Sequence, residues 1–225
     1  MDRTLALKVR EMVDELHRNQ ARTPSEAMLQ PRPAPPQKPT APSSAQGRRF
    51  GAELGLGVLA ALGGPPAGEP ARWGAAATAG PVMLDGSLRL SARAELSWLP
   101  PVTAQRAGAQ VRFGEIVPAL VLHSQLRQGG LWLGAHTGFG LSYVDATGTS
   151  SSGESRDATE RVALWLVGLE LELPMGAGFG LLLGVELQAR LRRQRFAVNG
   201  TEVVDLGRIR PLAGLALTWN PADLR

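Results

Sequence analysis

The most constraining feature of this sequence is a two-residue alternation of apolar and polar side chains between Phe50 and Trp219. Alternation at this period is typical of β-strands that have one apolar and one polar face. In the clearest run, residues 87–98, Leu, Ala and Trp alternate with Ser, Arg and Glu. The pattern therefore predicts an all-β chain. Its runs lie at about residues 50–62, 87–98, 102–113, 115–126, 130–145, 158–173, 177–196 and 205–220.

The connections between these runs alternate in length. Short turns on one rim and long loops on the other are typical of transmembrane β-barrels, and they place both ends of the barrel on the short-turn rim. The link at 113–115 is an exception, because it should be long and looks short. Tight turns are predicted near Pro100–Pro101, Gln128–Gly130 and Pro174–Gly178, and longer connections at about 63–86, 145–158 and 197–205.

Two strand assignments leave alternatives open. Residues 73–84 could pair as a hairpin around Asp85-Gly86, a strong turn dipeptide, and residues 102–126 could be one strand kinked at Pro118. An even number of strands is expected of single-chain bacterial barrels. We therefore predict an eight-stranded antiparallel up-and-down transmembrane β-barrel, with ten strands as the alternative.

The direction in which the apolar face points decides between a membrane barrel and a soluble one. Alternation alone fits a soluble sandwich or a lipocalin-like barrel equally well. The runs are longer than the strands of most globular sheets and are long enough for a tilted membrane strand. The polar face is rich in Gly and Ser, which a narrow lumen accommodates. These features favour an apolar face turned to lipid.

The polar face also carries charges of both signs in mid-strand. In an eight-stranded barrel the lumen is about filled by side chains, so we expect a plug of Glu/Arg pairs and not an open pore. The predicted lumen charge network consists of Glu53, Arg89, Arg93, Glu95, Glu170, Glu172, Glu186, Arg190, Arg192, Arg208 and Arg210.

Aromatic residues cluster at the strand ends, as expected where rings settle at the two membrane interfaces. One predicted girdle, on the short-turn side, consists of Phe50, Trp98, Phe179 and Trp219. The opposite girdle consists of Tyr143 and Phe196.

The segments outside the barrel, predicted to span 49–220, differ in composition. Residues 1–30 contain an amphipathic helix, interpreted as the end of a periplasmic region that could bind a periplasmic partner. Residues 31–48 form a proline-rich linker, and 221–225 a short tail. The N-terminus lacks the apolar core of a signal peptide, so the export signal is expected upstream of this chain. No stretch of 18 apolar residues predicts a membrane-spanning helix.

The sequence contains no motif that predicts catalysis, a metal site or a cofactor. There is no Cys, no phosphate loop and no metalloprotease motif, and no basic patch typical of nucleic-acid binding. His136 is expected in the lumen in a structural role, and the direction of His123 is uncertain. Ser142 shares the face of His136 but lies about 20 Å along the strand, too far for a Ser–His pair.

Residues 49–220 resemble the small bacterial outer-membrane barrels of the OmpA-transmembrane or OmpX type. The resemblance rests on the alternating strands, the rhythm of turns and loops, and the final aromatic strand Arg210–Trp219. Unlike those families, this chain continues after the last aromatic residue, from Asn220 to Arg225. The resemblance implies a bacterial outer-membrane location and a non-catalytic structural, anchoring or surface-interaction role, with a partner at the surface loops. The alternatives are a narrow pore or small-ligand barrel, and a soluble lipocalin-like barrel.

Overall fold

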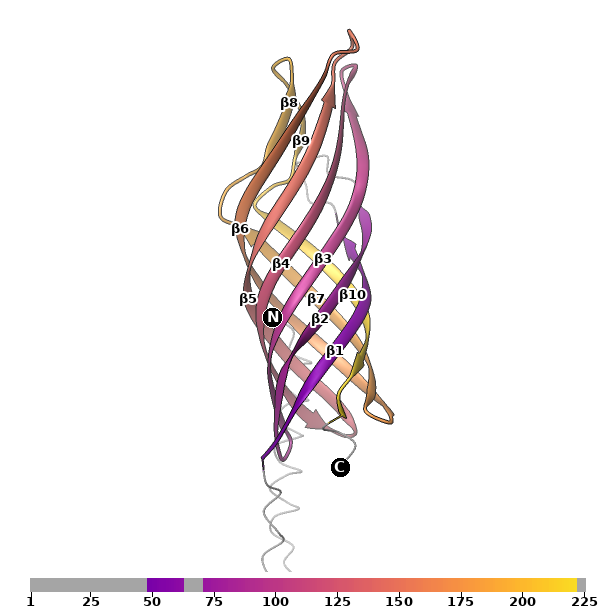
Figure 1. The fold of residues 1–225 in the computed structure, drawn as a ribbon, viewed down its shortest axis with the longest axis vertical. Coiled ribbons are helices and arrows are strands. Elements are labelled where there is room, and N and C mark those ends of the chain that lie inside the picture. The colour runs from indigo at the N-terminus through magenta and orange to yellow at the C-terminus, as the bar shows by residue number, and fades with distance from the viewer. Residues whose placement is uncertain (1–47, 63–70, 222–225) are drawn as a thin grey trace, which may run out of the picture. The chain divides into compact units, whose positions relative to one another are not determined.

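The computed structural model describes residues 48–62 and 71–221, which form a closed antiparallel barrel with a small hairpin at one end (Figure 1). The predicted N-terminal helix and nearly all of the proline-rich linker lie outside these residues. Eight strands close in the order β1-β10-β7-β6-β5-β4-β3-β2, which confirms the predicted fold class of the barrel. The barrel strands are β1 (Arg49–Ala61), β2 (Arg72–Asp85), β3 (Leu88–Arg106), β4 (Ala109–Gln128), β5 (Leu131–Thr149), β6 (Ser155–Gly176), β7 (Phe179–Arg190) and β10 (Ile209–Trp219).

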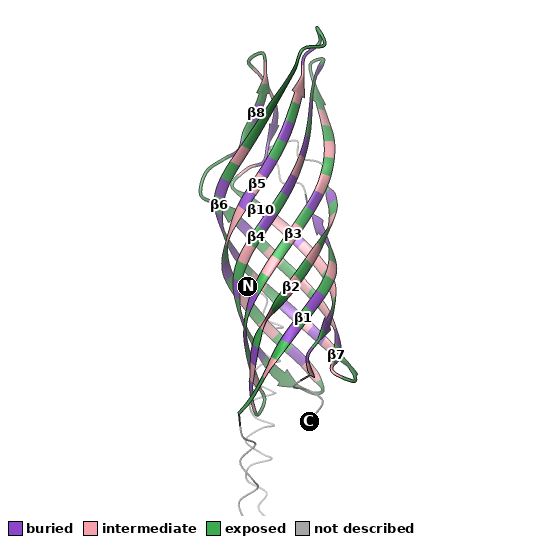
Figure 2. Ribbon diagram, viewed as in Figure 1, coloured by how far each residue is buried: buried purple, intermediate pink, exposed green. Residues whose placement is uncertain are grey.

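The outer face of the barrel is apolar, and the inner face carries the buried charged side chains. Figure 2 shows exposed and buried residues alternating along the strands. Leu90, Leu183 and Leu217 are 36%, 42% and 47% exposed, whereas Arg93 is 1% exposed. A barrel built for water has the opposite arrangement, because burying its apolar face drives folding. None of the described residues forms a helix long and apolar enough to cross a membrane.

The two rims differ, and one of them carries two of the three predicted tight turns, those near Gln128–Gly130 and Pro174–Gly178. Turns of two residues join β2 to β3, β4 to β5 and β6 to β7 on one rim, where β1 also begins and β10 ends (Figure 1). We call this the turn rim and the opposite one the loop rim. Gly129 and Gly130 have φ values of 57° and 90°, a conformation that glycine adopts without steric cost and that tight hairpin turns require.

The predicted long connection at 63–86 is wrong, because most of it forms the strand β2. Residues 72–85 pair with β1 along their whole length and with β3 on the other side. The hairpin around Asp85-Gly86, which the sequence left as an alternative, is therefore present. The count stays at eight and does not rise to ten, because the predicted strand at 102–113 is divided between β3 and β4.

The predicted turn at Pro100–Pro101 is wrong, and so is the predicted link at 113–115. β3 continues through the prolines with a register shift between Leu99 and Val102. Proline has no N–H to donate to the ladder, so the strand bulges there instead of turning. The real turn is Ala107–Gly108, where both φ values are positive. Both β3 and β4 are thus longer than predicted, and 102–126 is not one strand.

Strands β3 to β6 extend past the loop rim and carry a separate apolar core. The predicted loop at 145–158 is mostly strand, since β5 and β6 leave only residues 150–154 between them. A hairpin of β8 (Arg195–Val198) and β9 (Thr201–Asp205) packs against the inner face of this extension (Figure 1). We call the extension and its hairpin the platform. Its buried core consists of Ala109, Val111, Phe113, Val144, Ala146, Phe196, Val203, Val204 and Leu206.

Candidate functional site

The interior of the barrel contains ionisable and amide side chains in three layers. A buried apolar cluster lies between the levels of Glu115 and His123 and consists of Val117, Val121, Leu164 and Leu166. Strand β4 shows the order, because Glu115, His123 and Gln125 follow one another from the loop rim toward the turn rim and all point inward. We call the layers the loop-side layer, the middle layer and the turn-side layer. Each one joins side chains from several strands, so each ties together distant parts of the wall.

The loop-side layer is centred on the carboxylate of Glu115, which is fully buried. Arg72 and Arg190 each donate to it at 3.1 Å, and Arg210 contacts both of its oxygens. Ser142 adds a hydrogen bond of 2.7 Å from its hydroxyl group. One carboxylate thus accepts from three guanidinium groups that reach it from β2, β7 and β10.

Gln188 and Phe113 complete the loop-side layer. The amide oxygen of Gln188 accepts a hydrogen bond from Arg210. The guanidinium of Arg72 lies 4.7 Å from the centroid of the Phe113 ring, a distance at which the ring face attracts a cation. Since Phe113 belongs to the platform core, this contact joins the charged interior to the apolar cap above it.

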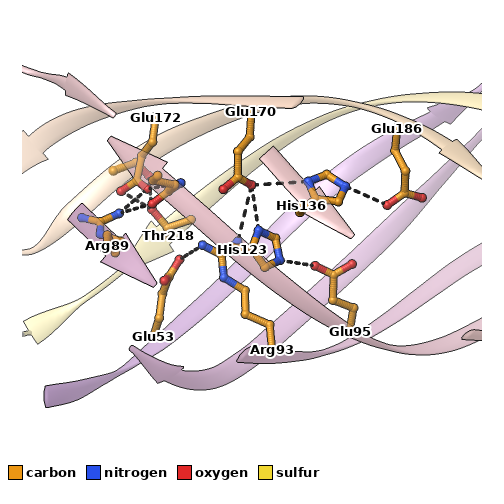
Figure 3. Close-up of polar contacts among 12 residues, drawn as sticks. Glu53, Arg89, Arg93, Glu95, His123, His136, Glu170, Glu172, Glu186 and Thr218 are labelled. Atoms are coloured by element: carbon orange, nitrogen blue, oxygen red, sulfur yellow. Dashed lines mark hydrogen bonds and ion pairs between the residues drawn. The ribbon is translucent and has the colours of Figure 1, made fainter. Parts of the chain in front are cut away.

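The middle layer contains two facing histidines and most of the interior carboxylates (Figure 3). His123 on β4 and His136 on β5 are directly paired across the ladder, with ring centroids 5.0 Å apart. Glu170 on β6 lies between them: its Oε2 is 3.0 Å from Nδ1 of His123 and 3.7 Å from Nδ1 of His136. Arg93 bridges Glu53 at 2.7 Å and Glu170 at 3.8 Å.

The turn-side layer is a single ion pair with amide, hydroxyl and aromatic neighbours. Arg89 contacts Glu172 at 2.5 Å and the amide oxygen of Gln125 at 3.0 Å. The hydroxyl of Thr218 donates to Glu172 at 3.2 Å. The guanidinium of Arg89 lies 4.3 Å from the centroid of the buried Trp132 ring. This layer therefore closes the interior near the turn rim.

Two of the predicted lumen charges lie outside the interior. Arg192 and Arg208 are exposed, and Arg192 donates to the backbone oxygen of Arg161. β7 ends at Arg190 and β10 begins at Ile209, so strand alternation does not apply to either residue. The interior residues from the predicted network are Glu53, Arg89, Arg93, Glu95, Glu170, Glu172, Glu186, Arg190 and Arg210.

The central residue of the loop-side layer, Glu115, is absent from the predicted network. The sequence reading placed it in a link between two strands, where the side chain has no defined direction. Arg72 is missing for the same reason, because residues 63–86 were interpreted as a loop. Continuous alternation from Ala109 to Gln128 is the signal that would have identified Glu115 and fixed the direction of His123.

Two aromatic assignments are also corrected. Trp98 faces outward but lies near the loop rim, since it pairs with Ile116, which in turn pairs with Tyr143. Phe196 belongs to the buried platform core and does not face outward. Trp73, which is 72% exposed on β2, lies outward near Trp98 and was not predicted. The outward aromatic residues at the turn rim are Phe50, Phe179 and Trp219.

Comparison with protein-family models and with curated protein sequences gives no match. Solved structures of outer-membrane barrels do match. A major outer membrane protein of Thermus thermophilus has a TM-score of 0.51 at 9% identity over 75% of this chain and 99% of that chain. Neisserial surface protein A has a TM-score of 0.46 at 9% identity over 77% and 99%. The Escherichia coli outer membrane protease OmpT has a TM-score of 0.40 at 9% identity over 76% and 96%.

At these identities the likeness concerns the fold. The chain has the fold of a small outer-membrane β-barrel, as the match to the Thermus thermophilus protein shows, and this confirms the resemblance stated from the sequence. Ser142 binds Glu115 in the loop-side layer, whereas His136 binds carboxylates in the middle layer, so the two side chains are not paired.

Proposed function

We propose that this protein is a closed, non-conducting barrel of the bacterial outer membrane that anchors the platform outside the cell as an interaction surface. The observation that carries the proposal is the continuous filling of the interior. Three polar layers cross the lumen, and the platform core covers the loop-side layer. The role is structural and non-catalytic, with the bilayer as one partner and a surface ligand of the platform as the other.

The strand lengths support this arrangement. A tilted membrane strand needs about 9–11 residues, and β7 and β10 have 12 and 11. β4, β5 and β6 have 20, 19 and 22 residues, so roughly half of each extends past the bilayer. The two groups of outward aromatic residues, near the turn rim and near the loop rim, then mark the two interfaces of the membrane.

The outer face suits hydrocarbon even where it carries polar atoms. Trp165 lies in mid-strand, about half exposed, and its indole N–H donates to the hydroxyl of Thr137 at 2.7 Å. That hydroxyl donates in turn to the backbone oxygen of Leu166 at 3.2 Å, and the Trp165 ring stacks on Phe139. Unpaired polar groups are costly in the bilayer core, and here the donors are paired.

The closed lumen predicts an absence of ion conductance. In planar lipid bilayers we expect the protein to insert and give no sustained current steps. A variant in which residues 192–207 are replaced by a short Gly/Ser turn lacks the β8–β9 hairpin and the Leu206 carbonyl that accepts from Arg190, but it keeps the side chains of all three layers. It should also be silent, because the ion pairs and not the hairpin close the lumen. Sustained steps in the wild type would favour the narrow-pore alternative, and steps only in the deletion variant would assign closure to the hairpin.

The proposed orientation can be tested with single cysteines, because the chain has no Cys. Ser152 lies in the exposed connection between β5 and β6, and Ser87 in the exposed turn between β2 and β3. In intact cells a membrane-impermeant maleimide should label S152C and leave S87C unlabelled until the outer membrane is permeabilised. Labelling of S87C alone would place the platform in the periplasm and contradict a surface role.

A further inference from the structure

We propose that His123, His136 and Glu170 in the middle layer bind a divalent first-row transition-metal ion of the zinc type. Imidazole nitrogens and carboxylate oxygens are suitable ligands for such ions. The three side chains are 3%, 9% and 2% exposed. One nitrogen of each histidine and one oxygen of Glu170 lie within 4.8 Å of one another.

The separations between these donors fit one shared ion. Donors bound to Zn²⁺ at about 2.1 Å in a tetrahedron are about 3.4 Å apart. The Glu170 Oε2 atom lies 3.0 Å from Nδ1 of His123 and 3.7 Å from Nδ1 of His136. The third separation, between the two histidine nitrogens, is at most 4.8 Å, so the proposed ion requires the two rings to turn closer together. The β4–β5 and β5–β6 ladders hold their backbones side by side.

The outer nitrogen of each histidine already faces a second carboxylate. Nε2 of His123 lies 3.4 Å from Glu95, and Nε2 of His136 lies 3.2 Å from Glu186 (Figure 3). Metal-binding histidines commonly donate their other N–H to a carboxylate, which fixes the tautomer and makes the ligand nitrogen more basic. His136 makes this hydrogen bond to Glu186, and Nε2 of His123 lies at ion-pair distance from Glu95. Both Nδ1 atoms face Glu170.

Two further features point to a ligand at this place. Nδ1 of His136 and Oε1 of Glu170 are buried and have no hydrogen-bond partner among the described residues, which is costly unless something else binds them. Gly168 provides the room for the His136 ring, since a Cβ there would clash with the ring at its Cε1 atom. A larger residue at 168 would displace the ring from Glu170.

The charge balance of the middle layer favours a cation. Its four carboxylates, those of Glu53, Glu95, Glu170 and Glu186, face a single guanidinium, that of Arg93. Buried charges are stable only when they are paired. A divalent ion between two neutral imidazoles and Glu170 offsets most of this excess negative charge and links β4, β5 and β6.

No sequence motif predicted this site, because its ligands come from three strands. Strand register brings the three ligands together. It pairs His123 with His136, and His136 with Gly168, which is two residues before Glu170 on β6. Short metal motifs depend on ligands within one turn of a helix or one loop, and this chain has none.

The test is metal content after refolding. The site lies between the loop-side and turn-side layers, so the ion should enter while the barrel closes. The full chain is refolded from urea into detergent with Zn²⁺, freed of loose metal with a weak chelator, and measured by mass spectrometry of zinc. We expect about one zinc per chain in the wild type. Refolding with Co²⁺ should give the visible absorption bands of a tetrahedral nitrogen–oxygen site.

The variants H136Q and E170Q remove single ligands, and E172Q is the matched control, because it changes a buried carboxylate of the same strand face in another layer. Ligand variants should retain roughly tenfold less zinc than the wild type, and E172Q should retain as much as the wild type. Heat-modifiable gel mobility verifies that each variant has folded. Zinc below about a tenth of an equivalent in the folded wild type, or equal zinc in H136Q, would overturn the proposal.

Discussion

Replacing Glu115 with glutamine is expected to lower the free energy of unfolding by about 3–5 kcal/mol. The amide keeps the shape of the side chain but removes the carboxylate that joins Arg72, Arg190 and Arg210. Three guanidinium groups would then face one another in a site screened from water. Urea unfolding in lipid vesicles, followed by tryptophan fluorescence, measures the change.

The matched control for E115Q is E154Q. Glu154 lies exposed in the connection between β5 and β6, and surface substitutions of this kind change stability by about 0.5 kcal/mol or less. Equal stability of the two variants would show that the loop-side layer does not depend on its carboxylate. A loss confined to E115Q identifies Glu115 as the centre of the network.

Replacing Leu169 with arginine is expected to destabilise the barrel by about 2–4 kcal/mol, the cost of a cation on the lipid face near the bilayer midplane. Leu169 is 64% exposed on the outer face of β6. It lies about midway between the turn rim and the level of Tyr143, which pairs with Arg161 on the same strand. Unfolding from lipid vesicles gives the size of the effect.

The control for L169R is T159R, on the same strand beyond Arg161. Thr159 is exposed and outside the proposed span, so the same substitution should cost about 0.5 kcal/mol or less there. If L169R were as stable as T159R, the outer face would be in contact with water, and the membrane assignment of the barrel would be wrong. The comparison therefore tests orientation independently of conductance.

The sequence predicted what depends on alternation and missed what depends on strand ends. Leu90 and Arg93 are three residues apart in a continuous run, so their opposite faces followed directly from the period. Glu115 follows a glycine, and Arg72 comes two residues after a proline. At both places the alternation of apolar and polar residues is interrupted, and the interruption was interpreted as a turn or loop. Arg192 and Arg208 were wrongly placed in the lumen, because the prediction extended the alternation past the last paired residues of β7 and β10.

The candidate metal ligands show a different limit. Alternation can place His136 on the inner face, but the neighbours of an inner side chain depend on the register between strands. That register follows from the turns. The turn at Gly129–Gly130, which the sequence located, puts His123 opposite His136. The connection between β5 and β6 was predicted as a longer loop at 145–158, so the register that brings Glu170 beside the two histidines did not follow from the sequence.

The bulge at Leu99 and Val102 has a consequence for how copies of this protein behave in a crowded membrane. Beyond it, β3 pairs with β4 alone, and β6 before Ala163 pairs with β5 alone, among the described residues. Open sheet edges invite a further strand, yet one edge here carries two prolines and the other Arg156, Asp157, Glu160 and Arg161. These side chains disfavour edge-to-edge pairing of neighbouring molecules into a continuous sheet. The surface ligand proposed above is therefore expected at the tips and broad faces of the platform.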